Sequence, residues 1–338
     1  MNANIKQGLK KMPLITEPVV LSMDSKNLPT GDHCVDLIVT SPPYPMVEMW
    51  DALFASADKI VERHLTLGAE TLAFNAMHEV LFPIWQECTR VLKPGGIVCI
   101  NIGDATRTLW KNFRFYPNHT KVIEAFNYLG LQSLPDILWH KPTNAPNKFM
   151  GSGMLPVNAY VTYEHEYILV FRKNPMRVFK TEAEKLLRRQ SAFFWEERNV
   201  WFSDIWSDIP GASQTSTTPQ RTAAFPFDLP YRLISMFSVQ GDLVLDPFAG
   251  TGTTLAAAET ANRRSIGVEI NPDFIPIIES TLKESRRNAF TYIQKRLEAH
   301  RVWARQRIEE KGPLKHYNSL YDFPVMTKTE SFIDLKGF

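Results

Sequence analysis

The amino-acid sequence predicts an α/β protein with a doubly wound, mixed seven-stranded sheet. Seven short apolar segments alternate with segments of helical period, which is the pattern of strands joined by crossover helices. One apolar segment, Leu243–Leu245, runs into a glycine turn and then into an alanine-rich helical segment. This order of strand, turn and helix is typical of the nucleotide-binding crossover in open α/β sheets.

The expected strands share a run of apolar or branched residues, and in chain order they cover 19–23, 35–40, 97–102, 137–140, 161–171, 243–245 and 265–268. Apolar residues at helical spacing predict helices over 48–64, 77–92, 121–129, 227–237, 253–261 and 273–310. The stretch 141–156 is rich in proline, glycine and asparagine, and we expect a loop there. The stretch 174–221 has no clean period, and the residues from Lys311 onward read as a tail.

The composition is that of an ordinary globular protein. The 338 residues are 44% hydrophobic and carry a net charge of only +2, so the overall charge does not indicate a nucleic-acid partner. The three cysteines stand singly, without the spacing of a metal site. No apolar run reaches the length of a membrane span. We therefore expect a reduced, cytoplasmic protein that holds no metal.

The turn after Leu243–Leu245 is the first functional signal. Asp246 and Pro247 end the strand, and the glycines of Gly250-Thr251-Gly252 let backbone approach a ligand closely. Thr253 or Thr254 then caps the following helix. The next strand ends at an acid, Glu269, which is where ribose hydroxyls would be held. The third glycine of a dinucleotide fingerprint and the lysine of a phosphate loop are both missing, so two acids beside the turn favour a ribose and a cationic group.

The second signal is Ser41-Pro42-Pro43-Tyr44, directly after the expected strand 35–40. The two prolines have no N–H, so this motif presents only acceptors, namely the Ser41 hydroxyl and main-chain carbonyls. An aromatic ring follows at once. Two acceptors beside a flat ring suit the exocyclic amine of a stacked base.

This pair of motifs resembles the β group of amino-methyltransferases that act on DNA, in which the catalytic half precedes the cofactor half. The likeness covers roughly residues 19–173 and 225–278, and implies the Rossmann-like methyltransferase fold, S-adenosylmethionine as cofactor and a flipped base in double-stranded DNA. It implies a catalytic role for Ser41, Pro42, Pro43 and Tyr44. The residues expected to bind the cofactor are Asp24, Thr40, Phe225, Asp246, Pro247, Phe248, Gly250, Gly252, Thr253 and Glu269. Members often carry His-Pro-Ala before the Phe-Pro pair; here Arg221-Thr222-Ala223 stand there, so no role is transferred to Arg221.

The resemblance also implies an organisation along the chain. We expect a catalytic half over 1–173, a target-recognition region over 174–221, a cofactor-binding half over 222–280 and a basic helical extension over 281–338. The location implied is the cytoplasm of a prokaryote, at the nucleoid. A restriction endonuclease is expected as a functional companion only, without a stable complex.

The target atom is the last expectation. Serine at the head of the catalytic motif resembles the N4-cytosine enzymes, and aspartate the N6-adenine enzymes. The hydrogen of the Ser41 hydroxyl could be donated to a ring nitrogen, which both bases offer, so N6-adenine stays an alternative. An RNA or protein methyltransferase and an inactive nucleic-acid binder are weaker alternatives. Glu164-His165-Glu166 reads as a polar strand face rather than a metal site.

Overall fold

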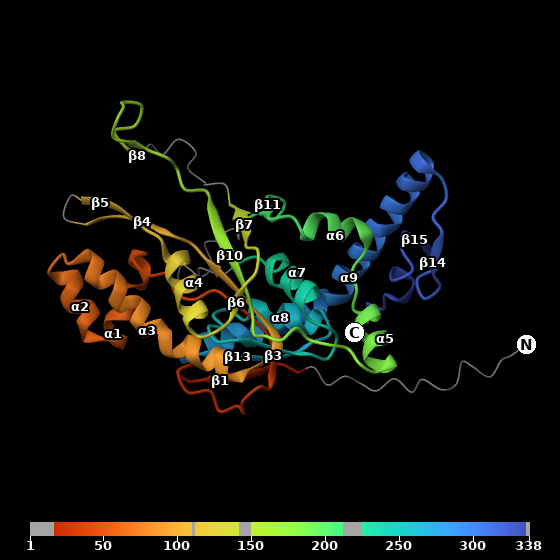
Figure 1. Cartoon of the computed structure of the whole chain (residues 1–338), viewed down its shortest axis with the longest axis horizontal. Helices are drawn as coiled ribbons and strands as arrows, with labels where there is room; N and C mark the ends of the chain where they lie inside the picture. The colour runs from red at the N-terminus through yellow and green to blue at the C-terminus, as the bar shows by residue number, and fades with distance from the viewer. Residues whose placement is uncertain (1–16, 110–111, 142–149, 212–224, 336–338) are drawn as a thin grey trace, which may run out of the picture.

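A computed structural model describes residues 17–109, 112–141, 150–211 and 225–335 of the chain. Its centre is a twisted sheet in the order β1-β13-β12-β2-β3-β10-β7-β11, with β6 paired to β10 (Figure 1). In chain order the strands are β1 Val19–Ser22, β2 Val35–Thr40, β3 Leu92–Ile102, β6 Gln132–Ser133, β7 Ile137–His140, β10 His165–Arg172, β11 Ile205–Trp206, β12 Leu243–Asp246 and β13 Arg264–Glu269.

The sheet is mixed, as predicted. The strands from β1 to β3 pair in parallel, whereas β10 runs antiparallel to both β3 and β7. All seven predicted strands are present in it. The two additional strands, β6 and β11, have two residues each and are too short to leave a pattern in the sequence. The predicted fold class is confirmed.

Helices cover both faces of the sheet (Figure 1). Alternate residues of β2 point to opposite faces: Ile38 joins the core beneath α1–α4, and Leu37 joins the core beneath α6–α9. The helices are α1 Asp51–Ala57, α2 Lys59–Thr66, α3 Glu70–Val91, α4 Asn118–Tyr128, α5 Glu182–Gln190, α6 Trp195–Trp201, α7 Asp228–Phe237, α8 Thr253–Thr260 and α9 Ile275–Lys311, and short 3₁₀ turns lie at η1 Glu48–Trp50, η2 Pro272–Phe274 and η3 Glu330–Phe332.

Two helix boundaries differ from the prediction. The helix expected over 48–64 is divided at Asp58, whose backbone is extended and whose carboxylate accepts a hydrogen bond from Ile60 N at 2.8 Å. Asp58 thus ends α1 and caps α2. The helix expected to start at Met77 starts earlier, at Glu70. No helix of the described residues has the combination of length and hydropathy that spanning a membrane needs.

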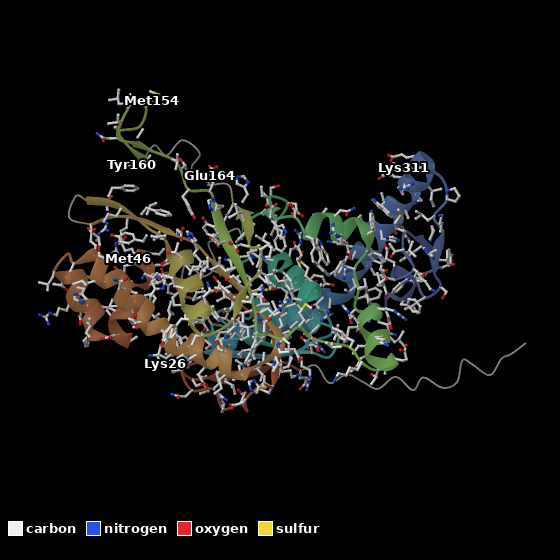
Figure 2. All side chains as sticks on the ribbon, in the orientation of Figure 1. Lys26, Met46, Met154, Tyr160, Glu164 and Lys311 are labelled. Atoms are coloured by element: carbon white, nitrogen blue, oxygen red, sulfur yellow. The ribbon has the colours of Figure 1, made fainter. Side chains whose placement is uncertain are left out.

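Three two-stranded hairpins lie outside the central sheet. They pair β4 Ala105–Leu109 with β5 Asn112–Tyr116, β8 Met150–Gly151 with β9 Ala159–Tyr160, and β14 His316–Asn318 with β15 Phe323–Val325. The hairpin of β8 and β9, with Met154 at its tip, stands away from the body of the protein (Figures 1 and 2).

The prediction of a tail from Lys311 onward was wrong. Phe323, Val325 and Ile333 are buried in the same core as α6 and α7, and Asn318 Nδ2 donates to the carbonyls of Glu330 and Ile333. The apolar residues of this segment are few and widely spaced, so they form no helical or alternating pattern. A compact C-terminal segment closes one end of the molecule.

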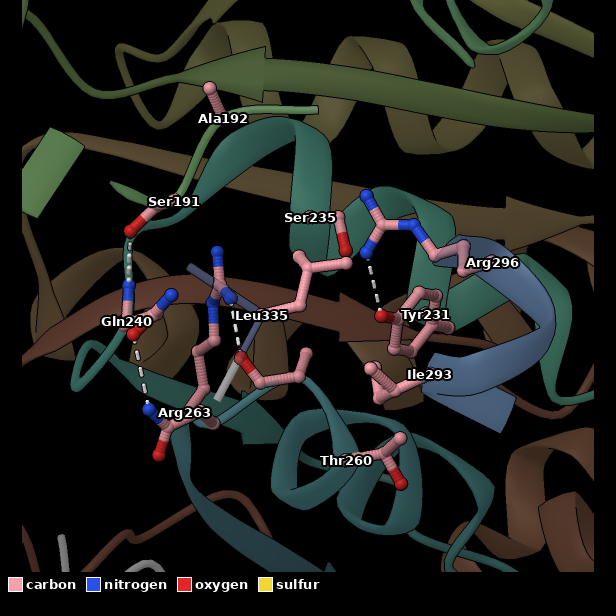
Figure 3. A pocket seen from close by; sticks show the side chains of 12 residues that line it. Ser191, Ala192, Tyr231, Ser235, Gln240, Thr260, Arg263, Ile293, Arg296 and Leu335 are labelled. Atoms are coloured by element: carbon pink, nitrogen blue, oxygen red, sulfur yellow. Dashed lines mark hydrogen bonds between the residues drawn. The ribbon is translucent and has the colours of Figure 1, made fainter. Parts of the chain in front are cut away.

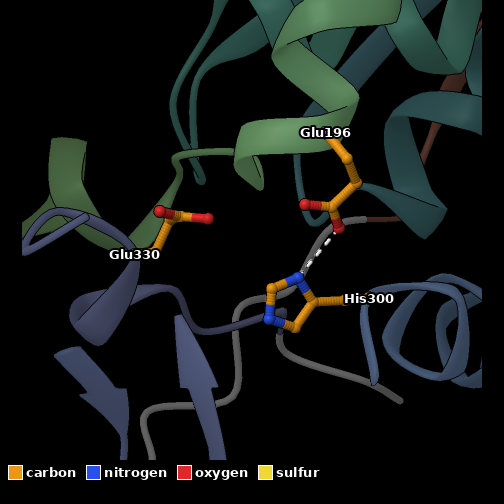
Figure 4. A group of neighbouring side chains, drawn as sticks. All are labelled: Glu196, His300 and Glu330. Carbon is orange, nitrogen blue, oxygen red and sulfur yellow. Dashed lines mark hydrogen bonds and ion pairs between the residues drawn. The ribbon is translucent and has the colours of Figure 1, made fainter. Parts of the chain in front are cut away.

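A buried polar group fastens this segment (Figure 4). His300 on α9 lies between Glu196 Oε1, 2.8 Å from Nδ1, and the carbonyl of Pro324, 3.1 Å from Nε2. Glu330 accepts hydrogen bonds from Trp195 N and Thr327 N. Glu196, His300 and Glu330 place one ligand atom each within 4.8 Å of one another. These groups are already occupied by hydrogen bonds of the protein, so they act here as a clasp.

Candidate active site

The carboxyl ends of β1, β2, β12 and β13 meet at one edge of the sheet and border a cavity of about 970 Å³. Open α/β sheets bind their ligands at this edge. One wall is formed by the glycine turn after β12, and another by Ser41 and the prolines that follow it. Apolar side chains of η1, α1 and α3, among them Trp50 and Leu81, close the far side.

Asp246 joins the two motifs beneath the cavity. Its carboxylate is 2% exposed, accepts a hydrogen bond from Thr40 Oγ1 at 2.6 Å, and accepts a second from Phe248 N at 3.0 Å. Burial raises the pKa of Asp246 to about 6. Because β12 pairs with β2, the last residue of one strand fixes the last residue of the other.

Glu269 holds the glycine turn from the end of β13. Its Oε2 atom accepts a hydrogen bond from Gly250 N, and its Oε1 atom accepts one from Asn271 N, both at 2.9 Å. Burial raises the pKa of this carboxyl as well. A carboxylate has about four acceptor positions, so Glu269 can hold the turn and still accept from a ligand.

The two glycines of the turn serve different purposes. A Cβ atom on Gly250 would meet nothing closer than 3.8 Å, and Gly250 lines the cavity. A Cβ atom on Gly252 would lie 2.8 Å from Ile278 Cγ2, and Gly252 does not line the cavity. Gly252 is needed for the packing of α8 against α9. It is also the N-cap of α8, in place of the expected Thr253 or Thr254.

Tyr44 turns inward from the catalytic motif. Its hydroxyl lies 3.0 Å from Ser41 Oγ, 3.0 Å from Glu166 Oε2 and 2.8 Å from Asn101 Nδ2. Burial raises the pKa of Tyr44 well above its ordinary value, and the nearby charge of Glu166 adds to this effect. Lys141 Nζ donates to the other oxygen of Glu166 at 2.8 Å. Ser41 is thus the cavity end of a network of polar side chains.

Glu166 and Asn101 were missed as site residues. Glu166 was expected on a polar strand face, but its side chain is only 14% exposed and belongs to the network. Asn101, 2% exposed, interrupts the apolar run of β3, and a lone amide within such a run is a signal that could have identified it.

The cavity brings together most of the predicted site residues. Those that line it are Asp24, Ser41, Pro42, Pro43, Phe225, Asp246, Pro247, Phe248, Gly250, Thr253 and Glu269. Thr40, Tyr44 and Gly252 do not line it; Thr40 acts on the site through Asp246, and Tyr44 contacts Ser41.

A second cavity lies beside the C-terminal segment (Figure 3). Its volume is about 20 Å³, which is room for a single water molecule. Arg263 and Arg296 line it from opposite sides, and Gln240 Nε2 donates to Asp334 O beside it. This cavity cannot hold an organic cofactor.

The fold and the large cavity define a Rossmann-like transferase that uses a nucleoside cofactor. The sequence profile of the DNA methylase family, which includes N6-adenine and N4-cytosine enzymes, matches residues 35–280. The chain belongs to this family. The prediction of S-adenosylmethionine as cofactor is confirmed at the level of the family.

Individual relatives agree with this assignment. The chain is 51% identical over 308 residues to the type II methyltransferase M.MthZI of Methanothermobacter thermautotrophicus, covering 90% of this chain and 85% of the relative. It is 52% identical over 263 residues to M.MjaI of Methanocaldococcus jannaschii, covering 74% and 86%.

Solved structures share the fold. TTHA0409, a DNA modification methylase of Thermus thermophilus solved with S-adenosyl-L-methionine, superposes with a TM-score of 0.64 at 30% identity, covering 80% of this chain and 94% of that one. The cytosine-N4-specific PvuII DNA methyltransferase has a TM-score of 0.53 at 16% identity, covering 81% and 93%, and at this identity the likeness concerns the fold alone.

Proposed function

We propose that the chain is a type II DNA methyltransferase that transfers a methyl group to the exocyclic N4 of a flipped cytosine in double-stranded DNA. The observation that carries the proposal is Ser41, an acceptor placed at the mouth of the cavity beside the cofactor turn. The relatives M.MthZI and M.MjaI are type II methyltransferases, which supports a role in restriction and modification. The choice of cytosine rests on the resemblance of the serine motif to the N4-cytosine enzymes.

The cavity suits the cofactor chemically. It offers a buried acid at Asp246, a partly bonded acid at Glu269 and open space beside Gly250. Glu269 would accept hydrogen bonds from the ribose hydroxyls, and Phe225 and Phe248 would cover apolar parts of the ligand. When bound, S-adenosylmethionine supplies a methyl group on a cationic sulfur that is already a good leaving group.

The residues of the chain orient the amine. Ser41 Oγ and the carbonyl of Pro42 would each accept one N–H of the target amine, which favours a pyramidal nitrogen and stabilises the charge that develops on it. Alignment of this nitrogen with the methyl carbon supplies most of the rate. Flipping the base costs a few kcal/mol. Stacking of the base on the Tyr44 ring stays a prediction.

Recognition of the DNA sequence is proposed for 174–221. Arg188 and Arg189 on α5 are exposed and could reach phosphates. The tryptophans of the same region, Trp201 and Trp206, are buried in the core, so they stabilise the region instead of contacting DNA.

The test is the identity of the methylated nucleoside. DNA from cells that express the protein is digested and its nucleosides are separated by mass spectrometry. N4-methylcytosine is expected, and Ser41→Ala should lose most of kcat while cofactor affinity, measured by calorimetry, is kept. Ser133→Ala, an exposed serine on β6, is the control and should behave as wild type. N6-methyladenine as the sole product would contradict the proposal and select the adenine alternative.

A further inference from the structure

The three polar neighbours of the Tyr44 hydroxyl determine the direction of its hydrogen bonds. These neighbours are Asn101 Nδ2 at 2.8 Å, Glu166 Oε2 at 3.0 Å and Ser41 Oγ at 3.0 Å. A phenol has one hydrogen and two lone pairs, so three neighbours use its whole capacity. One of them receives the hydrogen, and the other two must donate.

Asn101 and Glu166 fill two of these positions. Asn101 Nδ2 gives one hydrogen to Glu166 Oε2 at 2.7 Å, and the nitrogen faces Glu166 because an amide oxygen there would oppose a carboxylate. Its other hydrogen goes to Tyr44 Oη. Glu166, paired with Lys141 at 2.8 Å, can only accept, so it takes the hydrogen of Tyr44.

The remaining lone pair of Tyr44 Oη faces Ser41. Only the hydrogen of the Ser41 hydroxyl can fill it. We propose that Glu166 and Asn101 are positioning residues that act through Tyr44 to make the Ser41 hydroxyl an acceptor only. Both lone pairs of Ser41 Oγ are then free for the N–H groups of the target amine. This inference rests on the proposed transfer to an exocyclic amine at Ser41.

The arrangement has a chemical consequence for the substrate. Ser41 gives its hydrogen to Tyr44, so it does not donate to the ring nitrogen beside the amine, an option that the sequence left open. Donation to Tyr44 also polarises Ser41 Oγ, because linked hydrogen bonds strengthen one another. A stronger acceptor stabilises the positive charge that develops on the nitrogen in the transition state.

The test is a double-mutant cycle on the full chain with Tyr44→Phe and Glu166→Gln. If the glutamine oxygen stays on Lys141, its amide group faces Tyr44 and Asn101 with donors only. We expect each single variant to lower kcat about tenfold or more, in the range of one lost transition-state hydrogen bond. KM for DNA and calorimetric cofactor affinity should stay within about twofold of wild type.

Glu166 acts only through the Tyr44 hydroxyl, so the double variant should be no slower than Tyr44→Phe alone. Multiplied effects, or wild-type kcat in Glu166→Gln, would overturn the proposal. Glu164→Gln is the matched control: it lies just before the same strand, pairs only loosely with His140 at 3.8 Å, and should keep wild-type kcat. Asn101→Asp removes both donated hydrogens and should lower kcat as Tyr44→Phe does.

Thermal unfolding of the same variants without cofactor gives a second cycle that does not depend on turnover. The proposal expects the unfolding free energies of the two positions to be coupled, and strict additivity would overturn it. Product nucleosides identified in the same reactions report the target atom separately. N6-methyladenine with an intact cycle would refute the cytosine assignment and leave the network standing.

Discussion

The glycine turn can be tested with a matched pair of alanine substitutions. Gly252 has φ +82°, and its added Cβ would lie 2.8 Å from the fully buried Ile278. A left-handed conformation costs a non-glycine residue about 1–2 kcal/mol. Displacing a packed side chain costs about 1–3 kcal/mol more. Gly252→Ala should therefore lower the free energy of unfolding by about 2–5 kcal/mol.

Gly250→Ala should behave differently. Its φ of +52° brings only the conformational cost, about 1–2 kcal/mol. Its Cβ would occupy open space in the cavity, so cofactor affinity should fall. Urea unfolding measures the first effect and calorimetry with S-adenosylmethionine the second. Equal stability losses for the two variants, or a larger loss for Gly250→Ala, would refute this division of roles.

Further predictions concern the acids, the C-terminal segment and DNA. Glu269→Ala should weaken cofactor binding about tenfold or more, since a hydrogen bond to a charged group contributes roughly 1.5–3 kcal/mol, and unchanged calorimetric affinity would remove Glu269 from the site. Asp246 has a folded pKa of about 6, above its unfolded value, so its contribution to stability declines as pH rises from about 4 to 6. Cofactor affinity should rise over about pH 5 to 7, because a cation favours the ionised form, and Asp246→Asn should abolish this dependence. Deleting 312–338 exposes the core that its three buried apolar side chains cover, at about 1.5–3 kcal/mol each, so the truncated chain should melt far below wild type or fail to fold. Replacing Arg188 and Arg189 by alanine should lower DNA affinity and flatten its salt dependence while cofactor binding stays unchanged.

The strands were predictable because each carries a continuous apolar run. β2 is buried along its whole length, and such a strand leaves no ambiguity between core and surface. The boundaries of the first helices were less predictable, since Asp58 ends one helix and caps the next without breaking the apolar period. The division of the chain into 1–173, 174–221, 222–280 and 281–338 stays a prediction.

The site was predictable where function requires a special backbone. Gly250 and Pro42 stand out because few residues meet their conformational demands. Glu166 did not stand out, because a charged residue near the start of a strand is ordinary in a sequence. Its role depends on Tyr44 and Asn101, which come from other parts of the chain, and only the folded sheet brings these three side chains together.

The hydrogen bond between Thr40 and Asp246 joins residues 206 positions apart, which has a consequence for how the protein is made. Ribosomes add roughly 5–20 residues per second, so the β2 edge that pairs with β12 waits about 10–40 s for its partner. During this interval the nascent chain carries an open strand edge, which favours aggregation. Chains arrested before Leu243 should bind no S-adenosylmethionine and should need chaperones to stay soluble. In the cell, methylation can therefore begin only after translation has almost finished.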